Sequence, residues 1–317
     1  MRRFLTQRLV ALLPTLLGIS VIVFVVIHLI PGDTISAMIG TQYKLTEAQA
    51  VALRAYYGLD KPLVEQYFRW IAAAVQGNLG LSVRSGQPVL AEIARSFPLT
   101  LELTLLSVLI ALLVGVPIGI LSAVKRDTLV DLLARLFALT GMALPNFWLG
   151  TLIILVLSVV FGILPNSGDF VSFTGDPLRN LSQMIFPAIT LGFAFAASVM
   201  RTTRSAMLEV LRQDYVRTAR GKGLAENTVI IRHALSNALI PVITLVGVEF
   251  GYLLGGAVIV ENVFSLPGIG RLILNGIYQR DYAVVQGSIL FVALNFVVIN
   301  LLVDVVYALV DPRIRYE

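Results

Sequence analysis

Long stretches without a charged residue dominate the chain. They cover residues 9–30, 103–124, 136–164, 180–200 and 282–303, and a further stretch at 234–260 holds a single acid, Glu249. A helix rises about 1.5 Å per residue, so each stretch is long enough to cross a hydrocarbon layer of roughly 30 Å. The pattern predicts an all-α integral membrane protein with six transmembrane helices.

Composition supports a membrane protein and removes several classes of chemistry. Of the 317 residues, 57% are hydrophobic and 14% are charged, against about 25% charged in soluble proteins. The absence of cysteine excludes disulfides and thiolate metal sites. No phosphate-binding loop, metal-binding histidine pair or catalytic triad is visible. We therefore expect a chain that is not an enzyme and that holds no catalytic residue, metal or cofactor.

The distribution of basic residues predicts the orientation. Six spans place both termini on one side, and that side receives the larger share of the 24 lysines and arginines. Because basic residues are enriched in cytoplasmic loops, both termini should be cytoplasmic in a multi-pass protein. The same residues sit at span ends rather than in one patch, which argues against nucleic-acid binding.

Two segments between the spans are long enough to fold. The outward segment, residues 31–97, contains Thr46 and Gln49 at capping-box spacing, which predicts a helix through Tyr57. A second helix is expected over residues 62–75. The inward segment, residues 205–236, has the pattern of a helix, a glycine turn and a second helix.

Polar residues inside the spans are candidates for a translocation path. Glu249 lies near the middle of the fifth span, and no lysine or arginine lies in a span core. Such an acid contacts cargo on a water-filled path, or it is protonated or hydrogen-bonded between helices, and both interpretations stay open. For Asn295 helix packing is favoured over a path. Gly115 with Gly119, and Gly251 with Gly255, have the spacing of close helix contacts within the chain or with a second chain.

Residues 215–223, Tyr-Val-Arg-Thr-Ala-Arg-Gly-Lys-Gly, resemble the cytoplasmic EAA loop of ABC importer permeases. Ala219 and Gly223 fit that pattern, whereas Arg217 and Thr218 replace its first two residues. With the His-Ala-Leu that begins at His233, this form looks like the dipeptide, oligopeptide, glutathione and nickel permeases. Further matching motifs lie at residues 30–33, 58–62, 200–205, 261–271, 280–282 and 311–316, so the resemblance covers the whole chain.

The resemblance implies the type I importer fold and an assembly in the bacterial inner membrane. This chain would pair with a second homologous permease, two cytoplasmic ATPase subunits that bind ATP and magnesium, and an extracytoplasmic substrate-binding protein. The implied organisation is a cytoplasmic N-terminus with the first helix at 1–30, and an extracytoplasmic helical segment at 31–97. A transmembrane domain at 98–310, with its coupling loop at 205–236, and a cytoplasmic tail at 311–317 complete it.

The resemblance also assigns roles to residues. ATPase coupling falls to Tyr215, Arg217, Thr218, Ala219, Gly223 and Leu224. Contact with the binding protein falls to Asp33, Asp60, Glu261, Arg271 and Asp281. Similar permeases usually carry an amide where this chain has Glu249, so we expect this carboxylate to favour a cationic group on the cargo.

The expected cargo is a dipeptide, an oligopeptide or a similar small peptide such as glutathione. The same architecture importing nickel is the alternative, because cargo in these systems is chosen chiefly by the separate binding protein. An ATP-independent channel or secondary transporter would need no coupling loop. A membrane-embedded enzyme or electron carrier would need a catalytic constellation. Both fit the sequence less well.

Overall fold

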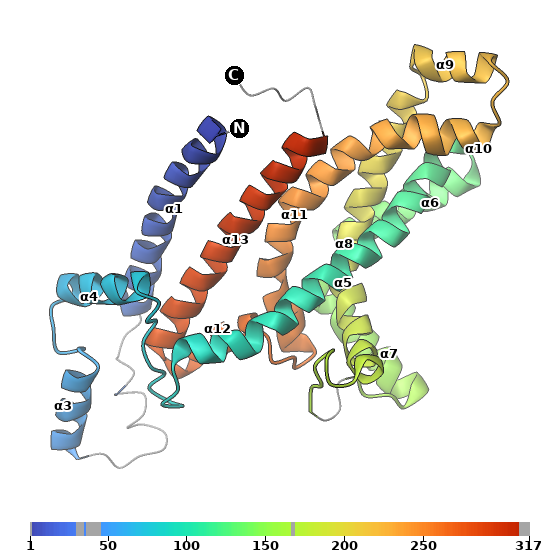
Figure 1. The fold of residues 1–317 in the computed structure, drawn as a ribbon. Coiled ribbons are helices and arrows are strands. Elements are labelled where there is room, and N and C mark those ends of the chain that lie inside the picture. The colour runs from blue at the N-terminus through green and yellow to red at the C-terminus, as the bar shows by residue number, and fades with distance from the viewer. Residues whose placement is uncertain (1, 30–34, 36–45, 166–168, 311–317) are drawn as a thin grey trace. The chain divides into compact units, whose positions relative to one another are not determined.

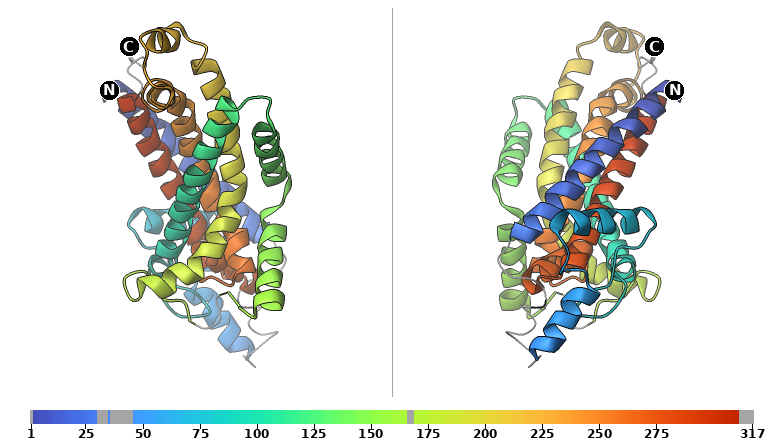
Figure 2. Two further views of the ribbon diagram at one scale, coloured as in Figure 1. Left: turned by 90° about the vertical axis from the view of Figure 1, so that its right-hand side faces the viewer. Right: turned by 90° about the vertical axis from the view of Figure 1, so that its left-hand side faces the viewer.

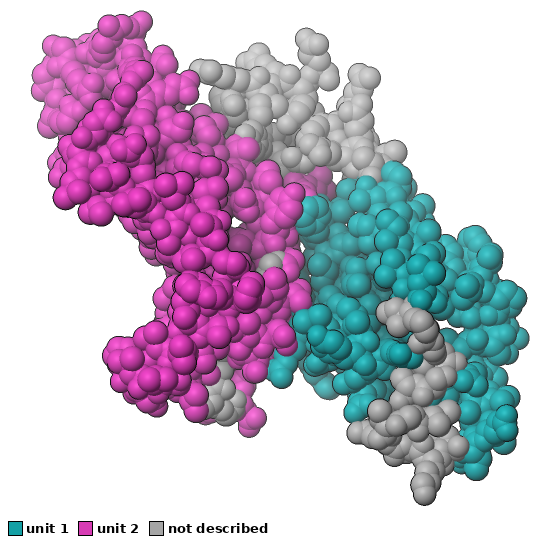
Figure 3. Space-filling model, turned by 180° about the vertical axis from the view of Figure 1, so that it is seen from behind, with its two compact units in different colours: residues 1–98, 267–298 teal, residues 99–266, 299–317 magenta. Residues whose placement is uncertain are grey.

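The computed structural model describes residues 2–29, 35, 46–165 and 169–310, in which the regular elements are helices (Figure 1). Two expected features, Asp33 and the tail 311–317, lie outside the described residues. The chain divides into two compact units (Figure 3). Unit 1 combines Met1–Pro98 with Pro267–Val298, and unit 2 combines Leu99–Leu266 with Ile299–Glu317. The units thus join segments that are distant in sequence.

Five helical stretches are long and apolar enough to cross a membrane. They lie in α1 (Arg2–Leu29), α5 (Val89–Val124), α8 (Pro177–Val210), the stretch Glu226–Gly255 that includes most of α11 (Ser236–Val263), and α13 (Tyr282–Val310). Several of these helices extend past the uncharged stretches that predicted them, since charged residues at the ends continue the same helix. The all-helical membrane fold expected from the sequence is confirmed.

The remaining predicted span, residues 136–164, is not one straight helix. It is divided between α6 (Leu129–Ala143) and α7 (Asn146–Phe161), which meet at an angle of 104°. The break falls at Leu144, whose backbone is extended with ψ of 123°, because the following Pro145 disfavours helical geometry in its predecessor. Gly162, at φ of 65°, ends α7 in the left-handed region. The pair makes a sixth span only if it is counted as one bent crossing.

In unit 1, the described part of the segment 31–97 contains the two short helices that the sequence predicts. Thr46 and Gln49 form the capping box that starts α3 (Glu47–Tyr56), and α4 (Leu63–Val75) follows Pro62. The hydroxyls of Ser20 on α1 and Tyr67 on α4 lie 2.9 Å apart, and the ring of Phe24 packs against Tyr67. The amphipathic helix α4 is therefore held against the C-terminal half of α1.

The rest of unit 1 is built around α12 (Ile269–Gln279) and the start of α13. Val89 and Ile93 on α5 pack against Ile269 and Val284 in a buried cluster. Asp281 begins α13, where it accepts hydrogen bonds from the hydroxyl of Ser82 at 2.6 Å and from the backbone of Val284. An acid at this position satisfies free backbone N–H groups of the first helical turn.

In unit 2, α8 is the central helix. Its residues Met184, Leu191 and Phe195 belong to the largest buried cluster, which also takes side chains from α5 and α11. Gly115 and Gly119 of α5 face α8 so closely that a β-carbon at Gly119 would stand 2.6 Å from Cβ of Thr203. At Gly255 of α11, by contrast, an added β-carbon would have no other atom within 4 Å. The first glycine pair therefore serves packing within this chain.

Candidate functional site

The segment between α8 and α11, residues 211–235, is the candidate for transmitting movement, and we call it the α9 segment. It contains α9 (Asp214–Gly221), α10 (Glu226–Thr228) and the π-helix η1 (Val229–Leu235), which runs directly into α11. Figures 1 and 2 show α9 beyond the end of α8. Gly223 makes the turn after α9 at φ of 77°, a conformation that glycine adopts without a steric penalty.

A small apolar contact and a set of polar contacts hold the α9 segment. Val216, Ala219 and Val229 form a buried cluster that packs α9 onto η1. The guanidinium of Arg220 donates two hydrogen bonds to the carboxylate of Glu226, at 3.1 and 2.6 Å, across the glycine turn. This hydrogen bonding raises the pKa of Arg220. The buried cluster thus packs α9 against η1, and the exposed ion pair adds a weaker link to α10.

The residues assigned to ATPase coupling do not all share one face. Tyr215 and Leu224 are 43% and 42% exposed, and Arg217 and Thr218 are exposed as well. Ala219, at 7% exposed, points into the cluster with Val216 and Val229, so it supports the segment rather than presenting a surface. Arg217 pairs with Asp214 of its own helix, and the hydroxyl of Tyr215 accepts a hydrogen bond from Asn237 on α11.

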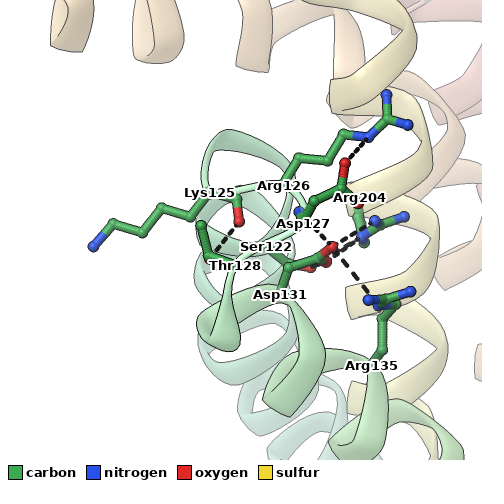
Figure 4. Close-up of polar contacts among 8 residues, drawn as sticks. All are labelled: Ser122, Lys125, Arg126, Asp127, Thr128, Asp131, Arg135 and Arg204. Atoms are coloured by element: carbon green, nitrogen blue, oxygen red, sulfur yellow. Dashed lines mark hydrogen bonds and ion pairs between the residues drawn. The ribbon is translucent and has the colours of Figure 1, made fainter.

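A buried ion pair joins the neighbouring helices at the same end of unit 2 (Figure 4). Asp131 on α6 is fully buried and accepts two hydrogen bonds from Arg204 on α8, at 2.7 and 3.0 Å. The hydroxyl of Ser122 on α5 and the backbone N–H of Asp127 donate to the same carboxylate. Three helices thus meet on one acid whose oxygens are all occupied.

Glu249 on α11 lies in a different setting. It lines a cavity of about 190 Å³ together with Asn146, Ser198 and Tyr252, and apolar residues of α8 complete the wall. Among the described residues, no hydrogen bond or ion pair to its carboxylate is found. A role of Glu249 on a translocation path stays a prediction. Asn295, the weaker candidate, donates to the backbone oxygen of Phe291 on its own helix at 2.9 Å.

The residues expected to meet a binding protein divide into two groups. Asp60 is exposed and pairs with Lys61 at 3.6 Å, and Arg271 is half-buried. Glu261 and Asp281 are only 0% and 2% exposed, so they do not present the binding-protein surface that was expected of them. Glu261 accepts a hydrogen bond from the hydroxyl of Thr100, and Asp281 caps α13. Both acids are structural groups in this chain, and a motif at a loop position could not reveal that they point inward.

Sequence reasoning missed the group around Asp131. Asp131 precedes the uncharged stretch at 136–164, and Arg204 follows the one at 180–200, so each looked like an ordinary charged residue at a span end. The available signal was their shared position at the same membrane boundary. Opposite charges at neighbouring helix ends favour a pair, although sequence does not show which helices are neighbours.

Models of known families match almost the whole chain. Residues 115–316 match the binding-protein-dependent transport system inner membrane component, and residues 1–104 match the N-terminal part of the corresponding membrane component. The chain belongs to this family. It is thus a multi-pass inner-membrane permease subunit of an ABC importer, as its sequence motifs predicted.

Curated relatives match over their full length. The glutathione transport system permease protein GsiC of Escherichia coli O6:H1 is 44% identical over 318 residues, covering 100% of both chains. GsiC of Escherichia coli K12 is 43% identical with the same coverage. Relatives of this permease are thus transport subunits named for glutathione.

Solved structures support the fold. The match to an inward-facing structure of the MetNI methionine ABC transporter covers 69% of this permease and 96% of the matched chain. Its TM-score is 0.55 at 17% identity. An amino acid ABC transporter crystallised with histidines covers 71% of this chain with a TM-score of 0.51 at 18% identity. At this identity the likeness concerns the type I permease fold and not the cargo.

Proposed function

We propose that this permease forms half of the translocation path of an ATP-driven importer for glutathione or similar short peptides. The observation that carries the cargo assignment is the full-length match, at 43–44% identity, to permeases named for glutathione transport. The proposed assembly adds a second homologous permease chain, two cytoplasmic ATPase subunits holding ATP and magnesium, and an extracytoplasmic binding protein. Both termini of this chain lie in the cytoplasm.

In this proposal the α9 segment transmits the ATPase movement. ATP binding brings the ATPases together, the α9 segment moves with them, and the helices change between inward-open and outward-open packings. Two features support the role: Tyr215 and Leu224 offer exposed apolar surface, and the Arg220–Glu226 pair with the Val216 cluster lets the segment move as one body. Exposed aromatic residues are frequent anchors at protein interfaces.

The cavity beside Glu249 is the proposed contact with cargo inside the membrane. A carboxylate in a membrane-spanning helix, bordered by Asn146, Ser198 and Tyr252, offers a cationic group a charged partner together with neutral hydrogen-bonding groups. A peptide amine fits this description. The preference of the cavity would be modest, since the separate binding protein selects the cargo first.

Reconstituted transport tests the proposal. The chain would be co-expressed with the products of neighbouring genes, placed in lipid vesicles, and supplied with ATP and the binding protein. We expect uptake of labelled glutathione that requires ATP and every partner. Uptake of nickel but not glutathione would move the assignment to the metal. Uptake by this chain alone without ATP would replace the importer with a channel or secondary transporter.

The role of Glu249 has its own test in the same vesicles. Glu249→Gln should slow uptake of a cationic peptide about tenfold, the loss expected when a hydrogen bond to a charged group is removed. Neutral peptides should be transported as before. Glu47→Gln removes an exposed carboxylate elsewhere and serves as the matched control. Equal transport of cationic and neutral peptides by the Glu249 variant and wild type would contradict contact with cargo.

A further inference from the structure

An open cleft of about 630 Å³ lies where α5, α6 and α8 reach the same end of unit 2. Four arginines line it, Arg126, Arg135, Arg204 and Arg212, together with the carboxylates of Asp127 and Glu209. We call it the arginine cleft. Arg212 lies at the start of the α9 segment, but none of the four arginines is among the residues assigned to ATPase coupling or to the transport path.

The arginines are not equivalent, because some already have partners. Arg204 forms an ion pair with Asp131, and Arg126 forms one with Asp127 at 3.2 Å. Arg135 stands 3.7 Å from Asp131, whose oxygens are already bonded to Arg204, and its side chain is 49% exposed. For Arg212 no side-chain ion pair is found within the described part of the chain. Arg135 therefore shares Asp131 with Arg204, and Arg135 and Arg212 are the two cleft arginines whose charge the described residues compensate least.

The surroundings of Arg135 are apolar and exposed. Leu132 precedes Arg135 by three residues and Leu139 follows it by four, so all three lie on one face of α6. The two leucines are 45% and 66% exposed. A guanidinium between exposed leucines at a membrane boundary suits a molecule that has an anionic head and an apolar tail. A free anion in water would gain nothing from the leucines.

We infer that the arginine cleft binds the phosphate headgroup of an anionic phospholipid, with its acyl chains along the Leu132–Leu139 face of α6. Arg135 and Arg212 hold the phosphate through charge-assisted hydrogen bonds, which guanidinium groups form in pairs. Arg204 stays on Asp131 and supplies the wall of the cleft. The carboxylates of Glu209 and Asp127 in the same lining offset part of the positive charge, so the attraction for an anionic headgroup is limited.

Lipid binding to the full-length chain tests this site. The purified protein in a neutral detergent is titrated with phosphatidylglycerol, phosphatidylcholine or glycerol 1-phosphate, and bound molecules are counted by native mass spectrometry. We expect one phosphatidylglycerol to bind in preference to phosphatidylcholine. Glycerol 1-phosphate should displace it poorly, because it lacks the acyl chains.

Variants locate the binding. Replacing Arg135 and Arg212 by Gln should weaken phosphatidylglycerol binding about fivefold per arginine. Replacing both by Lys keeps the charge but loses the paired hydrogen bonds, so its binding should fall between wild type and the Gln variants. Arg232→Gln removes an exposed charge outside the cleft and should bind as wild type does. Thermal unfolding verifies that each variant is folded.

Three results would overturn the inference. Equal weakening in Arg232→Gln would show that general charge, not the cleft, attracts the lipid. Equal binding of phosphatidylcholine would remove the preference for an anionic headgroup. Displacement by glycerol 1-phosphate at the concentration of the lipid would identify a site for soluble phosphate compounds instead.

Discussion

Two turns at the same end of unit 2 are built in opposite ways. The turn from α5 to α6 is tied down by Asp131, a fully buried acid bonded to Arg204 and Ser122. The α9 segment is held by a small apolar cluster and by Arg220–Glu226, an ion pair whose side chains are 39% and 53% exposed. A buried pair fixes helices to one another, whereas exposed pairs cost little to rearrange. The first turn is a structural joint, and the second is free to meet a partner.

Breaking the buried pair of Asp131 and Arg204 should have the largest effect on the stability of the protein. Asp131→Asn leaves Arg204 without its charged partner in a largely buried place, which should lower the free energy of unfolding by about 3 kcal/mol. The measurement is unfolding in a detergent series. Asp127→Asn, which removes the exposed acid four residues earlier, should change stability by less than about 0.5 kcal/mol.

The double variant makes this prediction sharper. If Asp131 and Arg204 act as one pair, replacing both by neutral residues should cost less than the sum of the single replacements. Additive costs would mean that Asp131 is held by Ser122 and the backbone alone, and the contrast between the two turns would weaken.

The next largest effect on stability is expected where α5 and α8 approach closely, one residue before Arg204. Gly119→Ala adds a β-carbon 2.6 Å from Cβ of Thr203, so it should destabilise the protein by about 2 kcal/mol through overpacking. Gly255→Ala meets open space and should be neutral or slightly stabilising, because alanine favours helix. Thermal unfolding of both variants distinguishes them, and equal shifts would argue against the close contact.

The exposed surface of the α9 segment should matter for coupling and not for stability. Tyr215→Ala should reduce cargo-stimulated ATP hydrolysis by the assembled complex about tenfold, as loss of an aromatic interface anchor does. Tyr215→Phe keeps the ring and loses only the bond to Asn237, so it should stay close to wild type. Tyr278→Ala, an exposed tyrosine on α12, should leave hydrolysis unchanged. A large loss in the Phe variant would assign the effect to Asn237 instead.

The smallest effect is expected at Arg220. Arg220→Gln removes an exposed ion pair and should cost about 0.5 kcal/mol at low ionic strength. Salt near 1 M should abolish the difference from wild type, because it screens exposed charges. Arg217→Gln, whose partner lies on the same helix, is the matched control. A cost that persists at high salt would mean that the pair is a rigid joint like Asp131–Arg204.

The sequence predicted the membrane helices well, because uncharged stretches of sufficient length have few other uses. It also located α3, whose capping box is a local signal, and the turn at Gly223. Pro145 signals a kink in this stretch, but the division into α6 and α7 at 104° was not predicted, since hydropathy does not register backbone direction. Local patterns thus determined the elements but not every change of direction.

Side-chain direction was the other limit on prediction. Glu261 and Asp281 lie in two separate motifs that resemble family signatures, yet both are hydrogen-bonded inside the protein. Ala219 matches the coupling pattern and packs inward for the same reason, since one face of α9 must contact η1. The ion pair of Asp131 with Arg204 required knowledge of which helices are neighbours, and one sequence does not contain it.

The central claim, that the α9 segment couples this permease to ATPase subunits, is tested most directly at its turn. Gly223 has φ of 77°, which proline cannot adopt and asparagine tolerates. Cargo-stimulated ATP hydrolysis would be measured in vesicles for complexes that carry Gly223→Pro or Gly223→Asn. We expect hydrolysis to collapse with proline and to stay near normal with asparagine. Full stimulation in the proline variant would contradict it.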